Sequence, residues 1–260
     1  MMKKWMMLMS AFPLNGLALD SMHCLKGCPE GSSQSNTVIQ RPIYVLNHNR
    51  TTKLADWVAY KVEETNFGPT RRRSYTNDPD LDASRYLKKT DYTGANAALG
   101  YEKGHLAPLA SFAGSTHWKM TNHYSNITPQ HKNLNGGPWK HLEAAIRDYA
   151  RTWQIPVYVV SGTLYDSPMT GLPNSSKSHQ VPSGFYKVIA TIEDGQVWAT
   201  GFEFHQVKTD YTNYCDYWKS VDDIEQRTGL NFLPHLSGAT ENDVEAGAWD
   251  LWYYLGCWEF

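Results

Sequence analysis

The strongest constraint on the fold is a pair of alternating runs in the second half of the 260-residue chain. Residues 184–192 and 197–204 flank the dipeptide Asp194-Gly195, and two such runs around an Asp-Gly turn predict a β-hairpin. The β-branched residues in 156–160 predict a buried strand. Earlier, 43–46 and 56–62 predict two strands joined by a polar turn at 47–50. These segments favour an antiparallel sheet.

One helix is predicted beside this sheet, from about Gly137 to Trp153. Pro138 suits its first turn, and apolar residues recur at the spacing of a core-facing stripe: Trp139, Leu142, Ile146, Tyr149 and Trp153. The polar stretch 76–93 predicts a loop. The fold class expected is therefore α+β, with an antiparallel β-sheet core flanked by helices.

The first 18 residues have the pattern of a secretory signal peptide. Lys3 and Lys4 precede an apolar run, and Gly16 and Ala18 offer small residues at the −3 and −1 positions for cleavage after Ala18. A buried N-terminal helix is the alternative. No other stretch approaches the roughly 20 apolar residues of a membrane helix. We expect a secreted or periplasmic protein with no membrane contact.

The mature chain, residues 19–260, is expected to form one domain. Its length alone permits two domains, but it contains no Pro/Gly/Ser-rich linker, repeat or low-complexity tract. Loss of two leader lysines takes the formal charge from −2 to about −4 with histidines neutral. This charge excludes a broad basic nucleic-acid clamp, so any contact with nucleic acid must be local.

Export makes the four cysteines more likely to be bridged than free. Three pairings are possible, and the pairing of Cys24 with Cys28 and Cys215 with Cys257 closes the two loops most easily. The longer loop is worth roughly 4 kcal/mol in the chain-entropy model. A zinc site is the alternative, but the second pair lacks the short spacing of zinc ligands.

Four polar residues within 105–147 form the candidate site: His105, Asn135, Glu143 and Arg147. They supply a neutral base, a hard oxygen ligand, a carboxylate to hold water and a cation for phosphate, the set that phosphodiester hydrolysis needs. Each of these residues also fits a purely structural role. His105 fits a strand end or the core, Asn135 a helix N-cap, and Glu143 with Arg147 an i,i+4 ion pair.

Three segments together resemble a known family. Residues 91–99, the Glu-Lys-Gly-His-Leu-Ala-Pro box at 102–108 and Asn-Ile-Thr-Pro-Gln at 126–130 look like the DNA/RNA non-specific endonucleases, secreted Serratia-type nucleases of the ββα-metal superfamily. Both cysteine pairs agree with this resemblance, which covers essentially the whole mature chain. It implies a ββα-metal active-site motif.

The resemblance also implies a role for each site residue. His105 matches the general base, Asn135 the single direct protein ligand of Mg²⁺, and Glu143 the acid that holds the metal's waters. Arg73 and Arg147 match two arginines that face the phosphate. The family box usually reads Asp-Arg-Gly-His, whereas here Glu102 and Lys103 precede Gly-His. Lysine lacks the bidentate fork of arginine, so the role of Lys103 is open.

The implied activity is endonucleolytic cleavage of DNA and RNA through phosphate-backbone contacts, without sequence specificity, leaving 5′-phosphate ends. The implied cofactor is Mg²⁺, or Mn²⁺ in its place, and a homodimer stays an alternative to a monomer. Two other classes fit parts of the sequence: a phosphodiesterase with a closed pocket for small substrates, and a non-catalytic secreted binding module. The module has no use for His105, Asn135 and Glu143 together.

Overall fold

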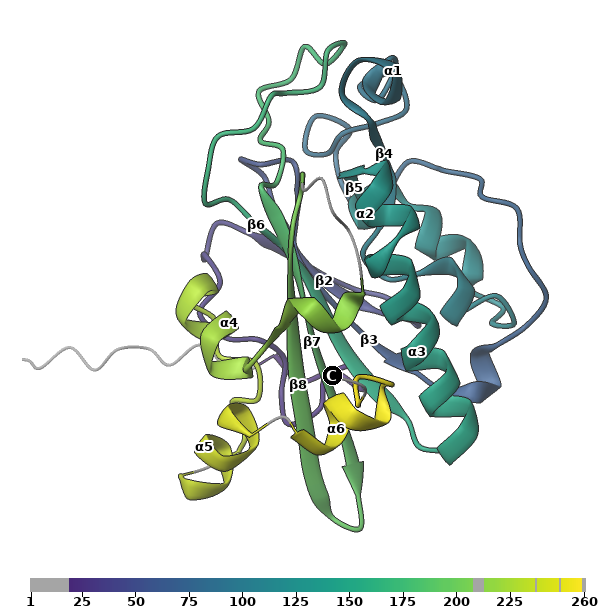
Figure 1. Cartoon of the computed structure of the whole chain (residues 1–260). Helices are drawn as coiled ribbons and strands as arrows, with labels where there is room; N and C mark the ends of the chain where they lie inside the picture. The colour runs from purple at the N-terminus through teal and green to yellow at the C-terminus, as the bar shows by residue number, and fades with distance from the viewer. Residues whose placement is uncertain (1–18, 208–212, 237, 248, 259–260) are drawn as a thin grey trace, which may run out of the picture.

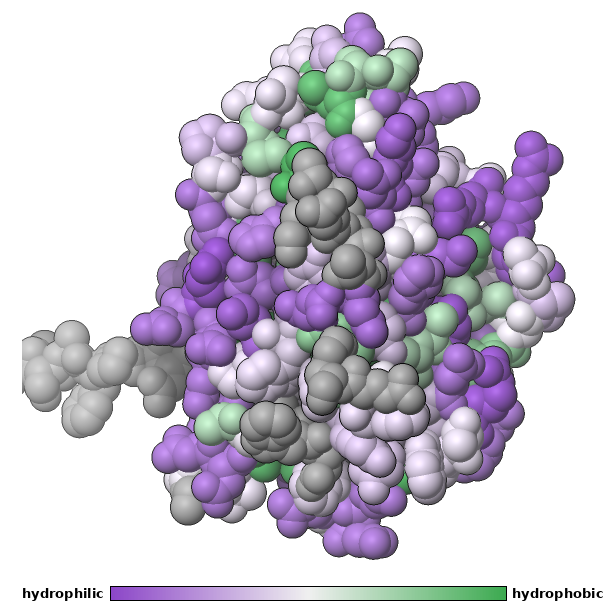
Figure 2. Space-filling model, viewed as in Figure 1, coloured by the Kyte–Doolittle hydropathy of each residue, from purple (hydrophilic) through white to green (hydrophobic). Residues whose placement is uncertain are grey.

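The computed structural model describes residues 19–207, 213–236, 238–247 and 249–258. The predicted signal peptide, residues 1–18, lies outside these ranges. Within the described part of the chain, no helix is both long enough and apolar enough to cross a membrane. The surface in Figure 2 is mostly hydrophilic, and apolar residues appear there as small separate patches.

The core of the fold is a seven-stranded sheet in which all neighbouring strands are antiparallel. Its order is β1-β2-β3-β6-β7-β8-β9. The bounds are β1 Thr37–Gln40, β2 Val45–Asn49, β3 Leu54–Val62, β6 Val157–Leu164, β7 Gly184–Glu193, β8 Gln196–His205 and β9 Trp218–Lys219. The α+β class and the β7–β8 hairpin around Asp194-Gly195 are confirmed.

A second sheet of two strands lies beside the N-terminal end of the long helix. It pairs β4 (Tyr101–His105) with β5 (Ile127–His131), and β5 leads into α2 (Lys132–Gly136) and α3 (Pro138–Trp153). Figure 1 shows α2 and α3 along one face of the large sheet, with β4 and β5 at their upper end. Two strands followed by a helix thus form the expected ββα unit.

The opposite face of the large sheet carries α4 (Val221–Thr228) and α5 (Ala239–Ala246). Side chains of β7 point alternately to the two faces of the sheet, and both faces are buried, so β7 contributes to two hydrophobic cores. Phe185 and Ile189 pack on the α3 side, whereas Tyr186 and Val188 pack with residues of α4 and α5. The remaining helices are α1 (Ala95–Leu99) and α6 (Trp249–Tyr254).

Two sequence predictions need correction. Residues 47–49 belong to β2 rather than to a turn, and the chain turns at residues 50–53 instead. Asn47 and His48 are polar but buried, and Asn36 donates to Asn47 Oδ1 over 2.5 Å, which lets the amide sit inside. Trp153 is 49% exposed because it ends α3, where its ring lies beside those of Tyr149 and Tyr254 at the edge of the core.

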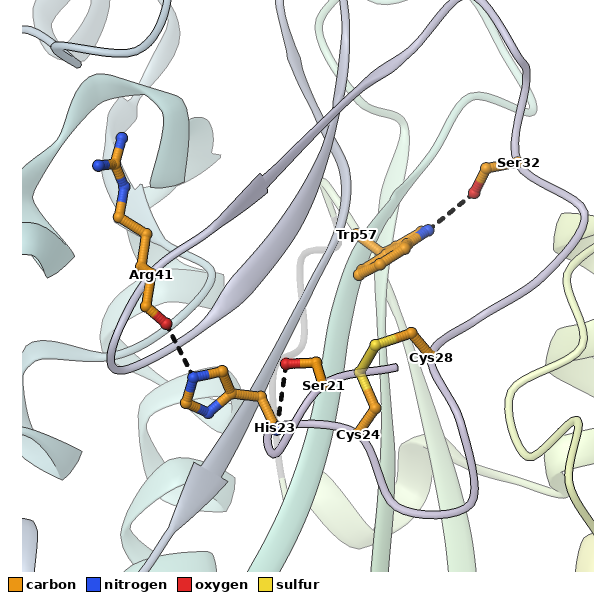
Figure 3. The surroundings of a disulfide bond; sticks show 7 residues. All are labelled: Ser21, His23, Cys24, Cys28, Ser32, Arg41 and Trp57. Atoms are coloured by element: carbon orange, nitrogen blue, oxygen red, sulfur yellow. Dashed lines mark hydrogen bonds between the residues drawn. A yellow bond between two sulfur atoms is a disulfide. The ribbon is translucent and has the colours of Figure 1, made fainter. Parts of the chain in front are cut away.

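Both predicted disulfides are present. Cys24 pairs with Cys28 and Cys215 with Cys257, which leaves no free cysteine. Figure 3 shows the first bridge near Trp57, whose indole donates to Ser32 Oγ over 2.8 Å. The second bridge ties the chain after β8 to the segment after α6. Two disulfides fit a protein that folds in an oxidising compartment.

Candidate active site

A cleft of about 670 Å³ opens between the chain before β4, the end of β4 and the first turns of α3. All five residues singled out in the sequence line it: Arg73, His105, Asn135, Glu143 and Arg147. They come from β4, α2, α3 and the chain before β4, and they lie up to 74 positions apart in the sequence. The ββα unit, which packs α3 beside the end of β4, accounts for this convergence.

His105 ends β4, where the chain leaves the two-stranded sheet. Its Nε2 lies 3.3 Å from Oδ1 of the fully buried Asn122. Because an amide oxygen only accepts, Nε2 carries the proton and Nδ1 of the neutral ring keeps a free lone pair. Burial lowers the pKa of His105 to about 4, the Asn122 hydrogen bond opposes this, and the charge of Arg73 adds to it. The ring is therefore a neutral proton acceptor over a wide pH range.

Asn135 lies in α2 and caps neither helix. Gly137 holds the N-cap position of α3, and the His131 side chain caps α2. The Asn135 amide instead donates from Nδ2 to Glu102 Oε2 over 2.8 Å. This bond fixes the amide so that its Oδ1 is left as a hard oxygen ligand.

Glu143 and Arg147 lie one turn apart on α3, but no ion pair joins them among the described residues. Glu143 Oε1 and Arg147 Nη1 are both buried, and neither has a hydrogen-bond partner within the described chain. Buried polar atoms are rarely left unpaired without a functional reason. A carboxylate oxygen and a guanidinium nitrogen that lack hydrogen bonds in one cleft suit a cation and an anion, respectively.

Lys187 is a charged residue of this region that the sequence analysis missed. It lies in β7, fully buried, with Nζ 3.7 Å from Glu143 Oε1 and 2.8 Å from Ser161 Oγ. The ammonium also lies over the Trp139 ring, 3.6 Å from its centroid. Burial lowers the pKa of Lys187 to about 8, although Glu143 raises it. Its signal in the sequence was a single charge within the apolar run 184–192.

Burial also raises the pKa of Glu143, whereas Lys187 and then Arg147 lower it. Desolvation causes both shifts, and the ion pair opposes both, because a buried carboxylate and a buried ammonium each stabilise the charged form of the other. Without Lys187, only the charges of Arg147 and Arg73 would offset the desolvation of the Glu143 carboxylate. The lysine therefore supports the ionised carboxylate at the cleft wall.

Lys103 lines a pocket beside the cleft rather than the cleft that holds His105. Its Nζ lies 5.3 Å from the ring centroid of Tyr75 and 5.5 Å from that of Tyr92. Burial lowers the pKa of Lys103. A smaller adjoining pocket contains these three residues together with Arg73 and Glu102, so Arg73 and Glu102 line both hollows.

The donor set of the cleft fits a divalent metal. Mg²⁺ prefers oxygen ligands and usually keeps several waters, binding through few protein groups. The Oδ1 of Asn135 and the Oε1 of Glu143, which accepts no hydrogen bond in the described chain, are oxygens of that kind. No cysteine lies in the cleft lining, which agrees with a hard rather than a thiophilic ion.

Comparisons with known proteins agree with this geometry. The model of the DNA/RNA non-specific endonuclease family matches residues 22–239. A nuclease of Serratia marcescens is 40% identical over 237 residues, covering 90% of this chain and 89% of that protein. A nuclease of Nostoc sp. is 25% identical over 247 residues, covering 87% and 85%.

A solved structure titled as the EndoG/EndoGI complex shares the fold, with a TM-score of 0.66 and 22% identity. The match covers 77% of this chain and 86% of that chain. The resemblance found in the sequence is thereby confirmed over most of the chain.

Proposed function

The chain belongs to the DNA/RNA non-specific endonuclease family, and from that premise we propose how its cleft hydrolyses the phosphodiester bond. The chain is a nuclease of a metal-dependent family that acts on nucleic acid. We propose the roles of the individual residues, the use of Mg²⁺ and the formation of 5′-phosphate products. One observation carries this proposal: Glu143 and Arg147, each with a buried side-chain atom that has no hydrogen-bond partner in the described chain, line the same cleft as His105.

His105 is the general base. Asn122 holds Nε2–H, so Nδ1 takes a proton from the attacking water as its oxygen bonds to phosphorus and the bond from phosphorus to the leaving 3′ oxygen breaks. The lowered pKa of His105 keeps the ring neutral and available. Asn122 thus acts as a positioning residue that selects the tautomer.

Asn135 Oδ1 would hold Mg²⁺, or Mn²⁺ in its place, and the Glu143 carboxylate would accept hydrogen bonds from waters bound to the ion. When bound, the ion stabilises negative charge on the phosphoryl and leaving oxygens. Glu102 keeps the Asn135 amide in the ligating orientation through its 2.8 Å hydrogen bond. Lys187 on β7 favours the ionised form of Glu143, with its Nζ 3.7 Å from Glu143 Oε1.

Arg147 and Arg73 bind the phosphate. Nη1 of Arg147 has no partner among the described residues, and a charge-assisted contact to a phosphoryl oxygen would satisfy it. Arg73 lies exposed at the edge shared by both hollows, where it can follow the backbone. These contacts read phosphate rather than base edges, which accounts for cleavage of both DNA and RNA.

We further propose that residues 19–260 form one nuclease domain, exported by the leader 1–18 to the periplasm or beyond. The two disulfides support an oxidising compartment. A homodimer remains an alternative to a monomer, and no observation on the described surface favours it.

The test is cleavage of supercoiled plasmid and of total RNA by the purified protein, with Mg²⁺, with Mn²⁺ and with chelator. Both substrates should be cut internally with either metal and should survive in chelator. The products should carry 5′ phosphates, so that ligase joins DNA fragments without kinase treatment. Undiminished cleavage in chelator, or 5′-hydroxyl ends, would contradict the proposal.

A further inference from the structure

Three carboxylates meet on the far side of the large sheet from the cleft. Asp222 and Glu225 lie on α4 and Glu245 on α5, and one oxygen of each lies within 4.8 Å of the others. Apolar residues of α4 and α5 pack into the core opposite to that of α3. Figure 1 shows these two helices on the side of the sheet away from α3. The cluster is therefore separate from the proposed catalytic metal site.

Glu245 is the member that marks the cluster as a binding site. It is 3% exposed, and its Oε1 is buried without a hydrogen-bond partner in the described chain. A buried carboxylate without a partner is costly, and proteins normally pair it or place a metal beside it. Ion pairs between described residues leave Asp222, Glu225 and Glu245 unpaired.

The surrounding charges are also negative. Burial raises the pKa of Glu245 to about 8, and Glu225, Glu241 and Asp222 raise it further in that order. Arg227, the cation of α4, is occupied elsewhere, at 2.8 Å from Asp166 and 3.3 Å from Glu203. Thus no cationic side chain in the described part of the protein forms an ion pair with these three carboxylates.

Neighbouring contacts hold the cluster in place. Glu225 Oε1 accepts a 2.7 Å hydrogen bond from the Phe232 backbone, which fixes its carboxylate against the segment after α4. Asn231 in that segment has a buried Oδ1 without a partner in the described chain, and its amide Nδ2 lies 3.4 Å from Glu241 Oε1. Carboxylate and amide oxygens thus gather between two helices and one loop.

We propose that Asp222, Glu225 and Glu245 bind a Ca²⁺ ion that links α4 to α5. Ca²⁺ bonds to oxygen at about 2.3–2.6 Å, so ligands on opposite sides of the ion lie up to about 5 Å apart. The spread of no more than 4.8 Å between the three oxygens fits this distance. Mg²⁺ is a poorer match, because it usually takes only one or two carboxylates and keeps its waters. Asp222 is exposed, which gives the ion a path from solvent.

The role of this ion is structural. It neutralises the buried carboxylate and joins the two helices that cover one core, so binding favours the folded state by mass action. The alternative is that Glu245 stays protonated and shares its proton with a neighbouring carboxylate. In that case Ca²⁺ has no effect on stability.

The test is thermal unfolding of the chelator-treated full-length mature protein, before and after addition of 1 mM Ca²⁺ or Mg²⁺ at neutral pH. The Asn135→Ala variant serves as background, because it removes the proposed catalytic ligand on the other face. Ca²⁺ should raise Tm by about 5 °C, and Mg²⁺ by clearly less. No rise with Ca²⁺, or an equal rise with Mg²⁺, would overturn the Ca²⁺ site.

Substitutions in the same background locate the ion. Glu245→Gln and Asp222→Asn should each abolish most of the rise in Tm. The matched control is Asp223→Asn, an exposed carboxylate on α4 outside the cluster, which should leave the rise intact. Without metal, Glu245→Gln should be at least as stable as its parent, which separates lost binding from misfolding. A full-sized rise in both Glu245→Gln and Asp222→Asn would refute the assignment.

Discussion

Glu102 Oε2 accepts a 2.8 Å hydrogen bond from Asn135 Nδ2, so an acid on β4 determines which atom the amide presents to the cleft. Glu102 stands where the family box usually has Asp, one methylene shorter. Its carboxylate reaches α2, where it accepts the hydrogen bond from Asn135. Removal of such a supporting contact typically weakens a metal site 10–100-fold.

We therefore predict that Glu102→Ala raises the Mg²⁺ concentration for half-maximal cleavage by about 10–100-fold. The rate at saturating Mg²⁺ should fall much less. Glu102→Gln keeps an acceptor oxygen and should recover most of the loss. In the double variant with Asn135→Ala, the loss should be no larger than in Asn135→Ala alone. Additive losses would show that Glu102 acts independently of the amide.

Lys187 gives a prediction on both stability and pH dependence. Lys187→Met leaves the Glu143 carboxylate buried without its ammonium, a change expected to cost about 3 kcal/mol in the free energy of unfolding at neutral pH. Since Lys187 lowers the pKa of Glu143, its loss raises that pKa further. The acid limb of the cleavage profile should then move to higher pH.

The double variant Lys187→Met/Glu143→Gln separates these two effects. It should regain most of the lost stability in urea unfolding, because the buried charge is gone, yet stay poorly active. Recovery of activity together with stability would mean that the Glu143 charge has no part in the reaction.

The titration of His105 is a third prediction. Its pKa in the folded protein, about 4, lies below the ordinary value of 6.5, so the neutral ring should persist well below pH 6 in NMR spectra of the metal-free protein. Protonation then favours the unfolded state. The stability that His105 contributes is complete above pH 6.5 and is lost as pH falls toward about 4. A midpoint at or above 6.5 would show that the ring is not desolvated.

Substitution of Lys103 tests whether this residue contacts the phosphate backbone without taking part in the metal-dependent reaction in the cleft. Its Nζ lies over two tyrosine rings in the adjoining pocket. Lys103→Ala should reduce the slope of log affinity against log salt by about 0.9 on duplex DNA and leave the Mg²⁺ dependence unchanged. Lys103→Arg should be tolerated. An unchanged slope and rate in Lys103→Ala would leave this residue without a functional role.

The periodic segments were predictable from the sequence because their patterns match their burial. The hairpin of β7 and β8 and the helix α3 followed from alternation and from an apolar stripe. The turn at 47–50 was wrong because Asn47 and His48 are buried polar residues. Composition cannot reveal that the Asn36 side chain will satisfy the Asn47 amide from another segment.

In the site, too, some residues were predictable from the sequence and others were not. His105, Asn135 and Glu143 were identified from motif spacing, and the fold places them in one cleft. The supporting residues were missed because their roles depend on contacts between distant elements. Asn122 reaches His105 across 17 positions and Lys187 reaches Glu143 from β7. The contact between Lys187 and Glu143 depends on the packing of α3 against β7, and the contact between Asn122 and His105 on the packing of the segment Trp118–Asn122 beside the end of β4.

The central claim, that one cleft hydrolyses both nucleic acids with His105 as base, is tested most directly by His105→Ala. Initial rates on plasmid DNA and on total RNA should fall in parallel by about 10²–10⁴, while the thermal unfolding midpoint stays near that of the wild type. The matched control is His141→Ala, an exposed histidine of α3 that does not line the cleft, and it should cleave both substrates normally. If His105→Ala retains activity within a few fold of the wild type on either substrate, the account of this cleft is wrong.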